Sequence, residues 1–93
     1  MNINERVLCE FDLNMAITFL VLFRERNVTR AAACMNVGQP AVSGSLARLR
    51  SYFDDPLFIR IKSGMRPTQK ATILASELSP AMNCIEAALK RLR

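Results

Sequence analysis

The sequence predicts a mainly α-helical fold in which three helices precede a short two-stranded antiparallel sheet and a long final helix. Apolar residues recur at helical spacing through most of the chain, and only residues 57–61 alternate as a β-strand does. A tight turn at residues 36–38 separates two of the helical segments. With 93 residues, of which 51% are hydrophobic, the chain can bury one small core.

The first helix is expected to begin after Asp12, a favourable N-cap residue, and to end near Arg26. Its apolar residues cover most of the helix circumference, so the helix must be buried on more than one side. In a chain this small, the second apolar side suggests a partner subunit. Residues 1–11 form an N-terminal extension in this interpretation.

The second helix is expected at residues 29–35, behind the N-cap residue Asn27, and Cys34 on it is assigned to the core. The third helix is expected at about residues 39–53. Pro40 fits its first turn, where the missing N–H group costs no hydrogen bond. One side of this helix is predicted to be buried, through Val42, Leu46, Leu49 and Phe53.

A β-hairpin is expected to follow the third helix. Residues 57–61 form the first strand, residues 62–64 the turn and residues 65–67 the short return strand. Two strands alone are marginally stable, so the hairpin must pack on the helices. Thr68 can cap a final helix that reaches Arg93.

The final helix carries a heptad pattern, which is typical of a helix that packs against another helix. The pattern predicts dimerisation through Leu74, Leu78, Ala81, Ile85, Ala88 and Leu92. The alternative is packing of these residues on the first helix of the same chain. Pro80 lies inside the run, removes one backbone hydrogen bond and is expected to bend or split the helix.

The net charge of +5 is concentrated in the middle of the chain. Residues 24–70 hold nine basic and three acidic side chains, whereas residues 1–23 hold one basic and three acidic side chains. Such a distribution indicates a surface that binds a polyanion. The alternative is a small basic protein whose Arg and Lys side chains are simply solvated.

The outward side of the third helix carries no charge between Gln39 and Ala47. Helix, tight turn, helix and basic hairpin make up a winged helix-turn-helix, in which the second helix of the pair enters the DNA major groove. Gln39 and Ser43 can bond base edges, while Pro40, Gly44 and Ala47 allow close approach, and Pro40 and Ala47 can touch a thymine methyl group. Cations that can contact phosphate surround this side: Arg48, Arg50, Arg60, Lys62 and Arg66. The alternative is that the small-residue side packs against another protein helix.

An enzyme is the weakest interpretation. The chain has no histidine, no phosphate-binding or dinucleotide-binding glycine pattern, and no metal-ligand spacing among Cys9, Cys34 and Cys84. We therefore expect no catalysis, cofactor or metal. The longest apolar run, residues 15–23, is too short for a bilayer, and unpaired cysteines suit a reducing cytoplasm.

Several motifs in order resemble the N-terminal DNA-binding domain of LysR-type transcriptional regulators, over roughly residues 12–90. They are Thr29-Arg30-Ala31-Ala32, Gln39-Pro40-Ala41-Val42-Ser43, Leu57-Phe58 with Arg60, and Pro67-Thr68. The ending LARLR of the third helix, Asp55-Pro56 and the stretch GMRPT resemble the branch with the nodulation regulators and LeuO. In two places the sequence departs from the family pattern: Gly38 replaces a capping Ser, and Gly44 replaces a long polar residue.

The resemblance implies a winged helix-turn-helix at residues 12–68 and a linker and dimerisation helix at residues 69–93. It implies a homodimer that reads dyad-related half-sites in double-stranded promoter DNA inside the cytoplasm, associated with the nucleoid. It implies that Gln39, Pro40 and Ser43 contact bases. It also implies contacts with the DNA backbone from Thr29, Arg30, Arg60, Lys62 and Ser63. A small-molecule co-inducer binds only a C-terminal domain that these residues do not include. The alternative function is a helical dimerisation or adaptor module with an incidental basic patch.

Overall fold

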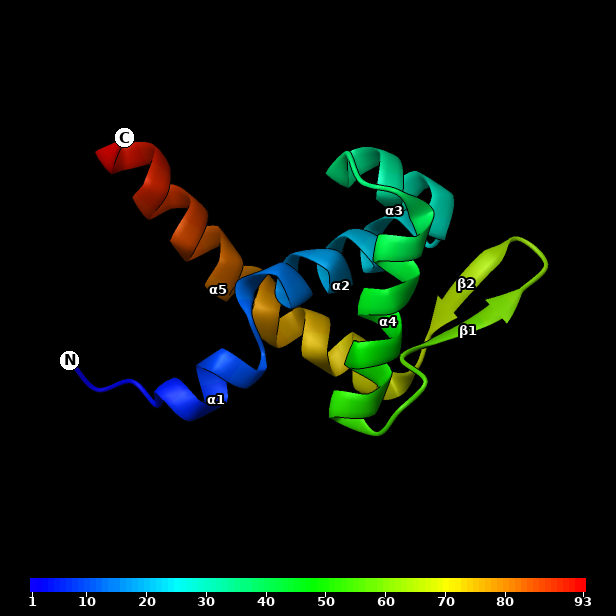
Figure 1. Cartoon of the computed structure of the whole chain (residues 1–93), viewed down its shortest axis with the longest axis horizontal. Coiled ribbons are helices and arrows are strands. Elements are labelled where there is room, and N and C mark those ends of the chain that lie inside the picture. The colour runs from blue at the N-terminus through cyan, green and yellow to red at the C-terminus, as the bar shows by residue number, and fades with distance from the viewer.

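The computed structural model describes residues 1–93 and contains five helices and one two-stranded sheet (Figure 1). In chain order the elements are α1 (Glu5–Glu10), α2 (Leu13–Glu25), α3 (Val28–Met35), α4 (Gln39–Phe53), β1 (Phe58–Ile61), β2 (Gly64–Pro67) and α5 (Gln69–Leu92). The mainly α-helical fold class predicted from the sequence is confirmed. It is a winged helix-turn-helix, made by α2 to α4 and the hairpin β1–β2, followed by a long helix. We call the hairpin, residues 58–67, the wing.

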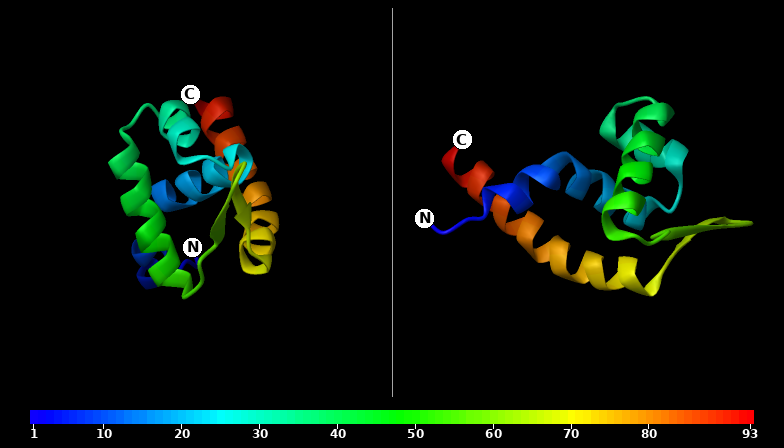
Figure 2. Two further views of the ribbon diagram at one scale, coloured as in Figure 1. Left: turned by 90° about the vertical axis from the view of Figure 1, so that its right-hand side faces the viewer. Right: turned by 60° about the horizontal axis from the view of Figure 1, so that its bottom comes forward.

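Helix α2 lies at the centre of the domain, with α4 on one side and α5 on the other (Figure 2, left). Its side chains Phe19 and Leu22 are fully buried, which explains why its sequence is apolar on more than one side. Phe19 lies 5.6 Å, between ring centroids, from Phe58 at the start of the wing. The core therefore joins the helices to the wing.

The predicted helix starts are confirmed by their capping hydrogen bonds. The side chains of Asp12, Asn27 and Thr68 accept from backbone N–H groups three residues on, at 2.9, 2.9 and 3.1 Å. Each satisfies a donor that the first helical turn cannot pair. Gly38 stands at the start of α4 and gives no side-chain cap, as expected from its residue type.

The first strand begins one residue later than predicted, because Leu57 cannot be part of it. Leu57 has φ of +61°, a left-handed conformation that a strand does not contain. Its N–H donates to the Asp55 carboxylate at 2.9 Å, and its side chain is fully buried. The return strand begins at Gly64, one residue earlier than predicted, and pairs with β1 in antiparallel register.

Outside the wing, the structure corrects one prediction and adds detail to two others. Cys34 is exposed and not in the core, because Ala31 and Ala32 supply the buried side of α3. Within the N-terminal extension, residues 5–10 form the helix α1, which the sequence analysis does not predict and none of whose residues is buried. Pro80 does not split α5, which is continuous from Gln69 to Leu92.

The heptad positions of α5 fall into two groups. Leu74 and Leu78 are half-buried and pack on the core of their own chain, beside the buried Ala71 and Ala75 of the same helix. This is the alternative stated above, packing on the first helix of the same chain, for the first part of the pattern. Further along, Ala81, Ile85 and Leu92 are exposed and Ala88 is half-buried. No helix of the chain is both long and apolar enough to span a bilayer.

Candidate nucleic-acid interface

A polar depression opens where the starts of α3 and α4 meet the wing near its turn. These elements form the end of the molecule away from both chain termini (Figure 1). The depression is lined by Arg26, Asn27, Val28, Thr29, Gln39, Ser43, Arg60, Gly64 and Met65. The structure thus brings together four residues that the sequence singled out, from three different elements: Thr29, Gln39, Ser43 and Arg60.

Helix α4 presents its uncharged side outward because the opposite side is held in the core. Val42 and Leu49 are buried at 1% and 0% exposure, so at 100° per residue the far side points to solvent. All four predicted base-reading residues are exposed: Gln39, Pro40, Ser43 and Ala47. A Cβ atom at Gly44 would meet nothing within 4 Å, so this position is open space on the same side.

At the start of α3, Thr29 is exposed at the edge of the depression, and Arg30 is exposed beside it. The Arg30 guanidinium is already engaged within the chain. Its Nη2 donates to the backbone oxygen of Glu25 at 2.8 Å, and its Nε lies 3.7 Å from the Glu25 carboxylate. Arg30 therefore joins the end of α2 to the start of α3.

The wing is fixed to the end of α2 by a main-chain contact. The N–H of Met65 donates to the backbone oxygen of Arg26 at 3.0 Å. Gly64 makes this approach possible, because a Cβ atom there would lie 2.6 Å from the same oxygen. Arg60 is opposite the buried Met65 in the sheet, so the two side chains project from the same face of the wing. This is the face turned toward the helices.

Like Arg30, two further arginines predicted to contact phosphate have partners in their own chain. Arg50 donates from Nε to the backbone oxygen of Pro56 at 2.8 Å and from Nη2 to that of Phe58 at 2.9 Å. It ties the end of α4 to the start of the wing. Arg48 lies on the other flank of α4, where its Nη2 is 3.8 Å from the Asp12 carboxylate.

The remaining predicted cations are on the wing. Lys62 and Ser63 are exposed at its tip, and Arg66 is exposed on the face that also carries Ile59. Neither Lys62 nor Arg66 is part of an ion pair, so their charges are available to an anion.

Asp55 holds the segment between α4 and the wing. The hydroxyl of Thr68 donates to its carboxylate at 2.8 Å, and the N–H of Leu57 donates at 2.9 Å. These two hydrogen bonds lower the pKa of Asp55 below its ordinary value of 3.8. The sequence analysis names Asp55 only as part of the motif Asp55-Pro56 and gives it no structural role. It also missed Arg26 and Gly64, although the hairpin turn Lys62-Ser63-Gly64 pointed to a glycine with a special conformation.

The chain matches the family model described as a bacterial regulatory helix-turn-helix protein of the lysR family, over residues 13–72. It is 42% identical over 78 residues to the HTH-type transcriptional regulator YidZ of Salmonella newport (strain SL254), covering 84% of this chain and 24% of that protein. The chain thus spans about a quarter of the length of this relative.

Two solved structures are similar to nearly the whole chain. The probable transcriptional regulator PA0477 from Pseudomonas aeruginosa is 39% identical with a TM-score of 0.87, covering 95% of this chain and 28% of that one. DarR of Vibrio fischeri, solved in complex with DNA, is 25% identical with a TM-score of 0.72, covering 99% of this chain and 29% of that one. The chain therefore belongs to the LysR family of bacterial regulatory helix-turn-helix proteins.

Proposed function

We propose that this chain binds double-stranded promoter DNA in a sequence-specific way, as the DNA-binding part of a LysR-type transcriptional regulator. The observation that carries the proposal is the polar depression, which brings Gln39 and Ser43 of α4 beside Thr29 of α3 and Arg60 of the wing. The DNA complex of the similar protein DarR supports it.

In this proposal α4 enters the major groove, which is about 12 Å wide and admits a helix with short side chains. Gln39 and Ser43 donate to and accept from base edges, and Gln can form two hydrogen bonds with adenine. Pro40 and Ala47 contact the groove through apolar atoms. Gly44 adds only clearance, since it has open space around it and no side chain.

Basic and hydroxyl side chains on either side of α4 contact the DNA backbone. Thr29, Arg60, Lys62, Ser63 and Arg66 are exposed around the depression and along the wing, where they contact phosphates on either side of α4. The wing itself lies on the flanking backbone and minor groove. Arg30 reaches phosphate by giving up its contact with Glu25, while Arg50 acts by fixing the wing through two carbonyl groups. Arg48 contacts phosphate on the other flank of α4.

We also infer a homodimer that binds dyad-related half-sites. Its support is an apolar groove between the start of α2 and the second half of α5, lined by Leu13, Ile17, Leu20, Met82, Ile85 and Leu89. Leu13, Ile17, Ile85 and Leu89 are exposed. A second α5, packed antiparallel, would cover them together with the predicted dimerisation residues Ala81, Ala88 and Leu92.

The wider assignments follow from family membership. We infer that the complete regulator acts in the cytoplasm on the nucleoid and forms higher oligomers. A small-molecule co-inducer would bind a further domain outside these residues. The ending LARLR of α4, Asp55-Pro56 and the stretch GMRPT support the branch with the nodulation regulators and LeuO.

The second candidate function is a dimerisation or adaptor module with an incidental basic patch, and the apolar groove favours it as much as it favours a DNA-binding dimer. A binding assay separates the two. With about six phosphate contacts per subunit, the logarithm of the DNA affinity should fall with the logarithm of salt at a slope near −5 per subunit. A dimer whose DNA affinity does not respond to salt would support the adaptor.

Base reading and backbone contact are distinguished by two variants. An operator selected from a random pool and a scrambled duplex serve as the DNA pair. Gln39→Ala should lose about 1–3 kcal/mol of discrimination between them, whereas Arg60→Ala should weaken both complexes about equally. Lys90→Ala, a cation at the opposite end of the molecule that pairs with Glu86, is the matched control and should change neither. Identical behaviour of the Gln39 and Arg60 variants would contradict the assigned roles.

A further inference from the structure

Glu25, the last residue of α2, places its carboxylate between two arginines. Its Oε2 accepts a hydrogen bond from Arg24 Nε at 2.7 Å, whereas its Oε1 lies 3.7 Å from Arg30 Nε, beyond hydrogen-bond distance. The Glu25 side chain is 23% exposed, and both arginine side chains are 64% exposed. One half-buried carboxylate is therefore shared by two exposed cations, and Arg24 holds it more closely.

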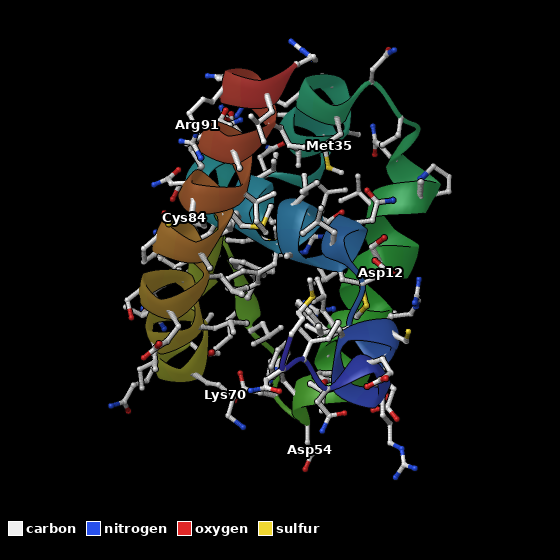
Figure 3. All side chains as sticks on the ribbon, turned by 90° about the vertical axis from the view of Figure 1, so that its left-hand side faces the viewer. Asp12, Met35, Asp54, Lys70, Cys84 and Arg91 are labelled. Carbon is white, nitrogen blue, oxygen red and sulfur yellow. The ribbon has the colours of Figure 1, made fainter.

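The two arginines belong to different surfaces. Arg30 is exposed at the start of α3, beside Thr29 of the polar depression. Arg24 lines the apolar groove between α2 and α5, on the same side of α2 as Ile17 and Leu20. Helix α4 lies on the other side of α2 from α5 (Figure 3). The groove and the depression have no lining residue in common, so Arg24 is not among the side chains assigned to DNA contact.

The partners of the Glu25 carboxylate decide how much of the Arg30 charge is available to DNA. A guanidinium binds phosphate through charge-assisted hydrogen bonds, and a carboxylate competes for the same N–H groups. The carboxylate also repels a phosphate that approaches Arg30. The hydrogen bond from Arg24 opposes both effects, because it gives the carboxylate a second counter-ion at a shorter distance.

The remaining contact of Arg30 does not reduce its charge. Its Nη2 donates to the backbone oxygen of Glu25 at 2.8 Å, which fixes the guanidinium at the end of α2. A guanidinium has five N–H donors, so most of them stay free for a phosphate when the carboxylate is held by Arg24.

We propose that Arg24 is a positioning residue for DNA binding: it holds the Glu25 carboxylate and thereby keeps Arg30 available to a DNA phosphate. The inference rests on the proposed function. It adds to the DNA-binding surface a residue that lies on the side of α2 away from α4.

The test is the dissociation constant of the 93-residue chain for an operator duplex selected from a random pool. Fluorescence anisotropy measures it between about 50 and 200 mM salt, where phosphate contacts dominate the change in affinity. Arg24→Gln should weaken binding about 2- to 5-fold, because Glu25 then pairs with Arg30 alone. The salt slope should become shallower by up to about 0.9 per subunit, the contribution of one phosphate contact. Arg24→Lys keeps the charge beside Glu25 and should stay within about 2-fold of the wild type.

A second substitution shows whether Arg24 acts through Glu25. Glu25→Gln removes the competing charge with little change in shape and should strengthen binding about 2- to 5-fold. In that background Arg24 has no carboxylate to hold. The double variant should therefore bind as Glu25→Gln does, within about 1.5-fold. A direct contact of Arg24 with DNA, or an effect of Arg24 on dimerisation, would instead weaken binding in both backgrounds.

Lys90→Gln is the matched control, because Lys90 lines the same groove, carries the same charge and pairs with Glu86 instead of Glu25. It should leave the DNA affinity unchanged. The positioning role is overturned if this control loses as much affinity as Arg24→Gln, if Arg24→Gln binds like the wild type, or if its loss persists beside Glu25→Gln. A wild-type chain whose DNA affinity does not respond to salt overturns the proposed function itself.

Discussion

Replacing Gly64 by Ala should detach the wing from the helices. Gly64 has φ of +131°, a conformation that costs an L-residue about 1–3 kcal/mol. The new Cβ atom would also lie 2.6 Å from the backbone oxygen of Arg26, so the wing must move and break the hydrogen bond from Met65, worth about 1 kcal/mol. Together these terms lower the free energy of unfolding by roughly 2–4 kcal/mol and the melting temperature by roughly 10–25 °C.

The chain provides a matched control in the same substitution at Gly44. There the added Cβ atom meets nothing within 4 Å, and Ala favours a helix interior over Gly by about 0.5–1 kcal/mol. Urea unfolding followed by circular dichroism should therefore give opposite signs for the two variants. If Gly64→Ala lies within about 0.5 kcal/mol of the wild type, the main-chain contact with Arg26 does not hold the wing.

Three further substitutions test other parts of the structure. Arg50→Lys should lower the free energy of unfolding by about 1–2 kcal/mol, because an ammonium group cannot hold the carbonyls of Pro56 and Phe58 together; an unchanged urea midpoint would contradict this role. Asp55 has a folded-state pKa below 3.8, so its carboxylate stabilises the fold above that pH, and the contribution is lost as the pH falls through the folded-state pKa. Asp55→Ala should accordingly be less stable than the wild type at about pH 7 and approach it in acid, whereas parallel stability curves across pH would refute the linkage. Gly38→Ser should raise stability by about 0.3 kcal/mol by capping α4, measured as a rise of about 1–2 °C in melting temperature.

The helix boundaries were predictable because they depend on neighbouring residues. Asp12, Asn27 and Thr68 each bond an N–H group three residues along the chain, so residue type and sequence position suffice to place them. The depression was predictable only in part. Gln39 and Ser43 follow from the phase of one helix, whereas their meeting with Arg60 depends on how the wing folds back.

The features that were missed depend on contacts between distant parts of the chain or on local strain. The charge of Arg50 predicts a contact with phosphate. Its hydrogen bonds to the carbonyl groups of Pro56 and Phe58 form only because the chain turns back after α4. Leu57 has the residue type of a strand, but its hydrogen bond to Asp55 and the burial of its side chain accompany a left-handed conformation. Cys34 follows three alanines on a short helix, so the sequence gives no periodicity from which to choose its buried side.

The hydrogen bond between Met65 and the backbone oxygen of Arg26 bears on which residues of the wing can change during evolution. This contact joins two peptide groups, so its contribution to the direction of the wing is independent of the residue type at position 26. Residues at the hairpin tip, Lys62 and Ser63, can then be exchanged or extended without changing that direction. The length of the wing tip can therefore be varied separately from the direction of the wing. A library varied only at the tip would sample different flanking contacts on an unchanged helical scaffold.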